Sequence, residues 1–249
     1  MCYPIGQFPA DKATRMKAAV DPKLENAQAK GRASVGRPRV SDVLPSEDPR
    51  QDIVEAAARL FSNKGLANVS VREIAAEAGL KKASFYYYFA SKDEIVDAMI
   101  EGLLDPALAA QKRLGKADLS EAARLYLYLH QDVEALCAAP YDCTWLIANC
   151  DLTDPRFQPY VKQRDQLIAW LAARIRKGKV SGAFADGDAS LIAKAMLSAT
   201  ENSVAWVDRS SIRQIAHAAE ELAGLLVRGI LAPDHDFAAV KAEADQFQF

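Results

Sequence analysis

The sequence predicts an all-α fold, with a three-helix helix-turn-helix domain followed by a larger helical domain. Residues 70–95, SVREIAAEAGLKKASFYYYFASKDEI, have the pattern of a helix, a tight turn, a short second helix and the start of a third. Beyond Pro106, apolar residues recur at helical spacing between Gly, Pro and Asp breakers. No segment in this second part has a convincing strand pattern, so helices are expected throughout.

The first helix of the motif has clear end signals. Ser70 is a favourable N-cap, and Glu73 stands three residues later, where a capping box requires it. Gly79 can adopt the left-handed backbone that ends such a helix, and Leu80 then returns to the core. These signals predict the turn between the two helices of the motif.

The second helix of the motif, residues 81–89, predicts an anion-binding surface. At 100° per residue, Phe85 and Phe89 point to one side, whereas Ala83, Ser84 and Tyr87 point to the other. Two lysines begin this helix, although the dipole of a helix is positive at that end. DNA phosphate would compensate the unfavourable charge, and a solvated basic helix end is the alternative.

Residues 53–95 resemble the TetR family of bacterial regulators. The resemblance rests on ARLF in the first helix, Gly65, VREIA-x-x-AGL, the Y-x-Y-F ending and SKD. Lys81 and Phe85 depart from the usual residues of the family, and these departures concern base preference rather than the fold. The resemblance implies a homodimer that binds double-stranded operator DNA and a small-molecule effector. The predicted DNA-binding residues here are Arg72, Lys81, Lys82, Ala83, Ser84, Tyr86, Tyr87, Tyr88 and Lys92.

Residues 1–45 are expected to form a flexible basic extension. They hold eight Lys or Arg and four Asp or Glu, net +4, so the remainder of this chain of net charge −2 carries −6. Within the extension, GRPR resembles the minor-groove core of an AT-hook, which would place Arg37 and Arg39 on DNA. A plain basic tail that attracts phosphate is the alternative.

The helices on either side of the motif complete the domain expected over residues 46–95. The first begins after Asp48, with Pro49 at its first position, and ends at Gly65. The fourth begins after Ser91, with Glu94 in capping-box position, and runs to about Leu104. Lys92 at its start is expected to clamp phosphate together with free backbone N–H groups.

Residues 96–231 are expected to form the effector-binding and dimerisation domain, and 232–249 a C-terminal tail. Two apolar stripes, in 187–207 and 211–231, suit close pairing of helices. The ending ELAGLLVRGIL resembles the closing helix of the family, whose last two long helices form a four-helix dimer interface. The alternative is packing within one chain. The expected interface residues are Ile192, Met196, Trp206, Leu222 and Leu226.

Aromatic and soft polar residues gather between these regions. A small-molecule site needs apolar walls with a few polar anchors. Tyr126 and His130 share a helix face, and Cys143 and Trp145 follow Pro140. These four are the candidate effector ligands, although core packing is the alternative role for each.

Other classes of function lack their motifs. Cys137, Cys143 and Cys150 do not have zinc-finger spacing, so no metal is expected. No catalytic or phosphate-cradling motif occurs, so neither an enzyme nor a cofactor is expected. Four cysteines without paired spacing indicate a reducing compartment, and no apolar run approaches the roughly 20 residues of a membrane span. A cytoplasmic protein without membrane contact is expected.

Two hypotheses follow. The first is a sequence-specific transcriptional repressor that a small molecule releases from its operator. The second is an all-helical interaction module that uses the helix-turn-helix surface for protein contacts. The lysines at 81, 82 and 92 favour the first hypothesis, because protein interfaces are depleted in lysine.

Overall fold

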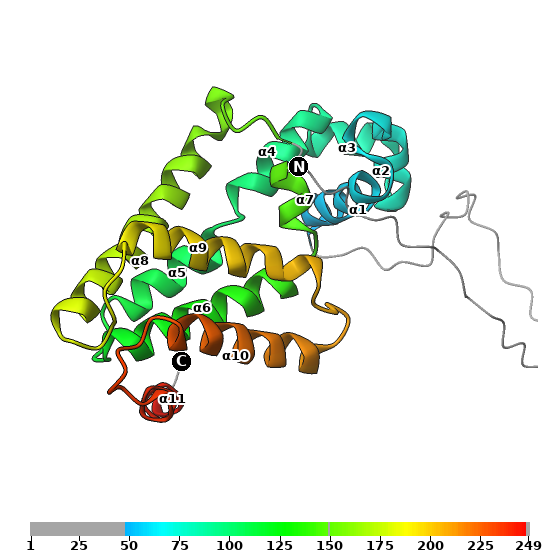
Figure 1. Ribbon diagram of the computed structural model, residues 1–249. Helices are drawn as coiled ribbons and strands as arrows, with labels where there is room; N and C mark the ends of the chain where they lie inside the picture. The colour runs from blue at the N-terminus through cyan, green and yellow to red at the C-terminus, as the bar shows by residue number, and fades with distance from the viewer. Residues whose placement is uncertain (1–47, 149, 248–249) are drawn as a thin grey trace, which may run out of the picture. The chain divides into compact units, whose positions relative to one another are not determined.

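The structure is a computed structural model that describes residues 48–148 and 150–247, apart from the side chains of Cys143 and Trp145 (Figure 1). All regular elements in the described part are helices, and an isolated bridge joins Phe184 to Leu231. The all-α prediction is therefore confirmed. None of the described helices has both the length and the apolar content to cross a membrane. Arg37 and Arg39 lie outside the described residues.

The helix-turn-helix domain comprises α1 to α4, residues 49–101, and we name it the head. Its helices begin and end with the predicted caps. Asp48 accepts hydrogen bonds from the backbone N–H groups of Arg50 and Gln51, and Gly65 ends the first helix with φ of 79°. Both hydrogen bonds of the Ser70–Glu73 capping box are present. The helices of the head are α1 (Pro49–Lys64), η1 (Leu66–Asn68), α2 (Val71–Glu77), α3 (Lys82–Tyr88) and α4 (Lys92–Glu101).

The core of the head comes from one side chain or more of each α-helix. Phe61, Ile74, Phe85 and Ile95 are fully buried, and they belong to α1, α2, α3 and α4 respectively. Because burial of a large apolar side chain contributes roughly 1.5–3 kcal/mol, these contacts fix the outward face of α3.

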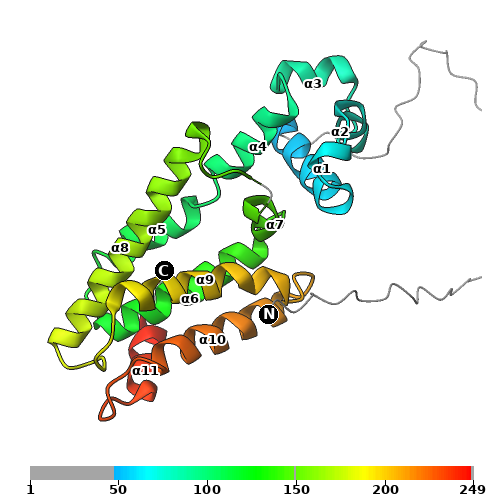
Figure 2. The same ribbon diagram turned by 45° about the horizontal axis from the view of Figure 1, so that its top comes forward.

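The described residues after α4 form a second group of helices, which we name the body. Its central helix is α6, because α6 packs against α5, α8, α9, α10 and α11. Figures 1 and 2 show α9 and α10 running along α6. Residues 121–138 suit this place because their apolar side chains surround the helix on most sides. The body contains α5 (Asp105–Leu114), α6 (Glu121–Ala138), α7 (Cys143–Ala148), η2 (Pro155–Phe157), α8 (Gln158–Val180), α9 (Ala189–Glu201), η3 (Asn202–Ala205), α10 (Ile212–Arg228) and α11 (Phe237–Gln246).

Gly178 lies inside α8, although glycine usually weakens the interior of a helix. A Cβ atom at Gly178 would stand 2.1 Å from the ring of Phe184, which is buried. The glycine is therefore needed for the close approach of that ring, and α8 continues for two more residues.

Residues 232–249 are not a simple tail. They contain α11, which packs on α6 and buries Val240 and Ala244. The carboxylate of Glu243 accepts hydrogen bonds from the backbone N–H and the hydroxyl of Ser120, the N-cap of α6. The sequence analysis did not predict α11, because the residues that hold it, such as Ser120, lie more than a hundred residues earlier in the chain.

Candidate nucleic-acid interface

The outward face of α3 has the composition predicted from its periodicity. Phe85 and Phe89 are buried, whereas Ala83 and Ser84 are exposed and the side chain of Tyr87 is 85% exposed. Tyr86 is also exposed, and Tyr88 is half-buried. A large aromatic side chain on the surface of a short helix offers both a hydroxyl and an apolar ring to a partner.

Cations on the head fall into two groups. Arg59 pairs with Glu77 at 3.4 Å, and Lys64 pairs with Glu73 at 2.8 Å. Within the described part of the chain, Arg72, Lys81 and Lys82 are exposed and have no ion pair. These three cations stand at the starts of α2 and α3, and we name them the free cations.

Glu73 keeps the start of α2 negatively charged. The hydrogen bond from Lys64, followed by the backbone N–H and the hydroxyl of Ser70, lowers the pKa of this carboxyl to about 2. The capping box therefore remains charged at every physiological pH. Lys64 is bound to this carboxylate, whereas the free cations have no such ion pair.

The ammonium of Lys92 turns into the protein. It donates to the carbonyl oxygens of Leu66 at 2.9 Å and Val69 at 2.7 Å, and the side chain is half-buried. The two acceptors precede α2, so Lys92 ties the start of α4 to the start of α2. This geometry differs from the expected phosphate clamp, and we leave Lys92 out of the proposed DNA contacts.

The cap of α4 also differs from the expected capping box. The hydroxyl of Ser91 accepts from the backbone N–H of Glu94 at 3.2 Å, as predicted. The carboxylate of Glu94, however, accepts from the backbone N–H of Ala90, one residue before the N-cap. Ala90 joins α3 to α4, so Glu94 also fixes this connection.

Two polar contacts, among others, join the remainder of α4 to the body. Asp97 lies 3.4 Å from a guanidinium nitrogen of Arg156, and the hydroxyl of Tyr141 donates to the carbonyl of Met99 at 2.9 Å. Burial raises the pKa of Asp97, although the charge of Arg156 opposes that effect. Through these contacts and through Lys92, α4 joins body and head.

Of the four predicted effector residues, the structure describes the side chains of Tyr126 and His130. The rings of Tyr126 and His130 lie 6.0 Å apart, but Tyr126 is buried and its ring meets that of Phe237 at 5.7 Å. His130 is partly exposed and stands 3.4 Å from Glu134. The side chains of Cys143 and Trp145 lie outside the described residues.

A buried polar cluster inside the body was missed by the sequence analysis. Asp132 on α6 and Thr200 on α9 are buried, and Thr200 Oγ1 lies 2.5 Å from the Asp132 carboxylate. Burial raises the pKa of Asp132 to about 7, and the nearby charge of Glu201 adds to the effect. One turn earlier, the buried hydroxyl of Tyr128 has no hydrogen-bond partner in the described part of the chain. An acid within the apolar run LYLYLHQDV was the available signal.

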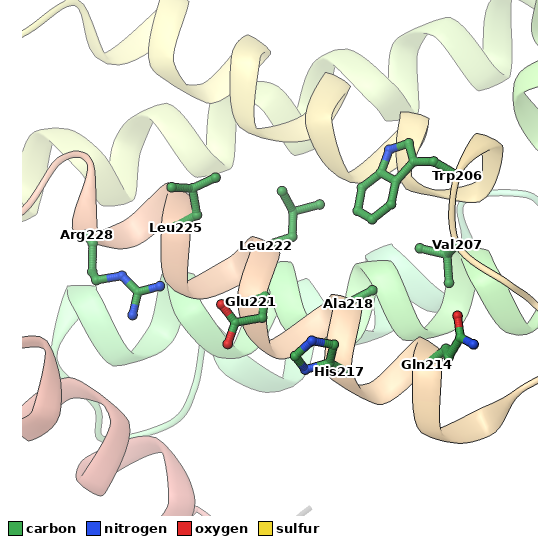
Figure 3. A pocket seen from close by; sticks show the side chains of 9 residues that line it. All are labelled: Trp206, Val207, Gln214, His217, Ala218, Glu221, Leu222, Leu225 and Arg228. Atoms are coloured by element: carbon green, nitrogen blue, oxygen red, sulfur yellow. The ribbon is translucent and has the colours of Figure 1, made fainter.

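A groove of about 520 Å³ follows the outer face of α10 (Figure 3). Trp206 and Leu225 in its wall are 61% and 63% exposed, and the half-buried Leu222 lies between them. The groove is lined by Trp206, Val207, Gln214, His217, Ala218, Glu221, Leu222, Leu225 and Arg228.

Of the predicted interface residues, Trp206 and Leu222 line this groove, and the others do not. Met196 is only 2% exposed within one chain, so its assignment to a subunit interface was wrong. Ile192 and Leu226 are half-buried against the core of the same chain. The predicted stripe on α9 is in part the face that packs on the body.

Comparison with known proteins gives the same domain. Residues 53–99 match the family model described as bacterial regulatory proteins, tetR family. The HTH-type transcriptional repressor KstR2 of Rhodococcus jostii (strain RHA1) is 30% identical over 102 residues, which are 41% of this chain and 50% of that repressor. The chain thus spans about half the length of the curated relatives it matches.

Solved structures share the fold over most of the described chain. The ketosteroid transcriptional regulator KstR2 of Mycobacterium tuberculosis aligns with a TM-score of 0.67 at 24% identity, over 75% of this chain and 96% of that one. AibR in complex with isovaleryl coenzyme A and operator DNA aligns with a TM-score of 0.59 at 18% identity, over 72% and 98%. Residues 53–99 thus match the TetR family of bacterial regulatory proteins, and the described chain shares the all-helical fold of these solved regulators.

Proposed function

We propose that this protein is a sequence-specific transcriptional repressor that binds operator DNA through α2 and α3. The observation that carries the proposal is the set of free cations beside an exposed α3 face, on a head where Arg59, Lys64 and Lys92 have partners. An unpaired cation at a helix start is unfavourable in the free protein and favourable against phosphate. The related KstR2 is named a repressor, which supports the direction of regulation.

The roles at the DNA follow from length and position. Arg72 and Lys82 have the reach to contact base edges in the major groove, and an Arg–guanine pair discriminates by roughly 1–3 kcal/mol. Ser84 and Tyr87 offer hydroxyls to phosphate, while the tyrosine ring can contact a thymine methyl group. We also propose that the protein is located in the cytoplasm, where its operator DNA lies. We propose no catalytic activity for it.

We propose a homodimer whose interface includes the groove on α10. The groove is apolar at Trp206, Leu222 and Leu225, and it carries Glu221 and Arg228 on the same face. A twofold interface brings the same patch of both subunits together, so a surface with both signs of charge can be self-complementary. Such a dimer presents two α3 helices to major grooves about 34–36 Å apart, or further for wider half-site spacing.

We propose that a small-molecule effector binds inside the body and lowers DNA affinity. Tyr128, Asp132 and Thr200 supply polar anchors within apolar walls, which is the composition of small-molecule sites. AibR was solved with both isovaleryl coenzyme A and operator DNA, which supports this pairing of ligands in the fold. The effector acts through different affinities for two arrangements of α4, because only differential binding shifts an equilibrium.

A binding-site selection on random duplex DNA at fixed salt tests the proposal. We expect the wild-type chain to enrich an inverted repeat, and Arg72→Ala to relax base preference at one position of each half-site. Arg59→Ala is the matched control, because it removes an arginine of the same head that already pairs with Glu77.

Two results would contradict the proposal. Failure of the wild-type chain to enrich any sequence would remove DNA readout as its function. Equal relaxation by Arg59→Ala and Arg72→Ala would show that general loss of positive charge, rather than a base contact by Arg72, explains the change.

A further inference from the structure

Arg209 lies in the loop between η3 and α10, and its side chain caps the C-terminal end of α6. Its Nε donates to the carbonyl of Cys137 at 3.0 Å, and its Nη2 donates to the carbonyls of Ala139 and, at 3.3 Å, Tyr141. The last carbonyls of a helix lack partners within it, and Pro140 has no N–H to offer them. Arg209 thus fixes both the last turn of α6 and the loop that carries Tyr141.

The side chain of Tyr141 likewise caps the C-terminal end of α4. Its hydroxyl donates to the carbonyl of Met99 at 2.9 Å, across 42 residues of sequence. The amide four residues beyond Met99, that of Leu103, bonds to Ile100 at 3.2 Å, so it does not serve the Met99 carbonyl. Tyr141 therefore supplies a partner that the last turn of α4 lacks.

These contacts form a continuous path between two functional regions. At one end, Val207 lines the groove on α10 and stands two residues before Arg209. At the other end, α4 carries Lys92, whose ammonium is bound to the carbonyls that precede α2. The guanidinium of Arg209, the loop of Tyr141 and the helix α4 connect these two ends.

We propose that Arg209 and Tyr141 are positioning residues that tie the groove end of the body to α4 and thereby set the placement of the DNA-reading head. This inference rests on the proposed function and adds the residues that join its two parts. A second subunit seated in the groove orders residues 206 and 207, and through Arg209 it orders the loop that holds α4.

Hydrogen exchange on the full-length chain tests the path without DNA. Tyr141→Phe removes one hydroxyl and no carbon, and we expect amides 98–103 to exchange about threefold to tenfold faster, as loss of one hydrogen bond allows. Val180→Ala is the control, because that side chain is 90% exposed at the end of α8, so these amides should be unchanged.

The relay from Arg209 is tested by a double-mutant cycle. Arg209→Gln should speed exchange in residues 98–103, although its hydrogen bonds go to residues 137, 139 and 141. If Arg209 acts through Tyr141, the double variant exchanges no faster than the more affected single variant. Unchanged exchange in Tyr141→Phe, or effects that add in the double variant, would overturn the proposal.

A DNA readout separates positioning from simple stabilisation. On operators found by selection, the wild type should discriminate against one base pair added to or removed from the half-site separation. Tyr141→Phe should weaken this discrimination by about threefold or more, while affinity for the best operator changes less. Discrimination equal to that of the wild type would overturn the inference. If the wild type enriches no operator, the proposed function fails, and the exchange experiment still decides the path.

Discussion

Lys92 and Asp132 stand where their charge is unfavourable, and each has a structural partner. Lys92 begins a helix at the positive end of its dipole, and its ammonium turns to two carbonyl oxygens. Asp132 is buried between α6 and α9, where its carboxylate contacts the hydroxyl of Thr200. Single-residue experiments can separate these structural roles from functional ones.

The first prediction concerns Lys92. Its replacement by Ala should weaken DNA binding by loosening α2, and the slope of log affinity against log salt should stay unchanged. Lys81→Ala, at a free cation not assigned to a base edge, should lower that slope by about one, because each phosphate contact releases about one counterion. Titrations over a range of salt concentrations measure both slopes. An equal decrease of slope in the two variants would restore Lys92 to the phosphate contacts.

The second prediction concerns the pH dependence of stability. The pKa of Asp132 is about 7 in the folded protein, against an ordinary value of 3.8. Between these values the unfolded chain binds fewer protons than the folded one, so folding stability falls as pH rises from about 4 to 7. The full difference corresponds to about 4 kcal/mol.

Asp132→Asn should therefore stabilise the protein at pH 8 and lose that advantage near pH 4. We expect a gain of about 2 kcal/mol, or a Tm increase of about 4–8 °C, because the amide must still be hydrogen-bonded. Thermal unfolding at both pH values measures it, with Asp165→Asn on the exposed side of α8 as the control. A loss of stability at pH 8 would mean that the carboxylate is ionised and well partnered in the folded protein.

At the scale of elements, α11 is held on α6 by contacts at both its ends. The ring of Phe237 packs on the ring of Tyr126. The guanidinium carbon of Arg228 lies over the Phe237 ring, 4.6 Å from the centroid of that ring. Gly224 makes room for this ring, since a Cβ atom there would stand 3.3 Å from it. At the other end, Glu243 holds Ser120 at the start of α6.

The third prediction is that α11 contributes to the stability of the body. Phe237→Ala should lower the free energy of unfolding by about 1–3 kcal/mol, less than for a fully buried Phe because this ring is half-buried. Val180→Ala, at a side chain that is 90% exposed, should change it little. Denaturant unfolding compares the two variants. Equal effects would show that α11 does not pack on the body in solution.

At the scale of the whole molecule, we propose that the groove on α10 forms the interface between two subunits. The fourth prediction is that the wild type sediments as a dimer at micromolar concentration and that Leu225→Glu sediments as a monomer. Loss of the second subunit should weaken operator binding by about a hundredfold or more, because two linked heads bind more tightly than one.

Val180→Glu is the matched control for assembly, since it places the same charge on an exposed apolar site away from the groove. It should remain a dimer with wild-type operator affinity. A monomeric wild type would exclude the proposed interface, and dissociation of both variants would show that added charge alone prevents assembly.

The sequence by itself determined the reading head. Its helix ends depend on neighbours within a few residues: Asp48 with Pro49, Ser70 with Glu73, and the positive φ of Gly65 and Gly79. Helical periodicity also predicted which side of α3 faces outward, because two phenylalanines on one side must be buried.

Only the tertiary structure decided the partners of residues whose contacts lie far away in the chain. The carbonyls that bind Lys92 are 23 and 26 residues distant, and Thr200 is 68 residues from Asp132. Met196 was assigned to the wrong face because α9 has apolar side chains on two sides, and periodicity does not say which side meets α6. Local signals fix where a helix begins and ends, whereas packing between distant segments fixes which of its faces is buried and which side chains meet.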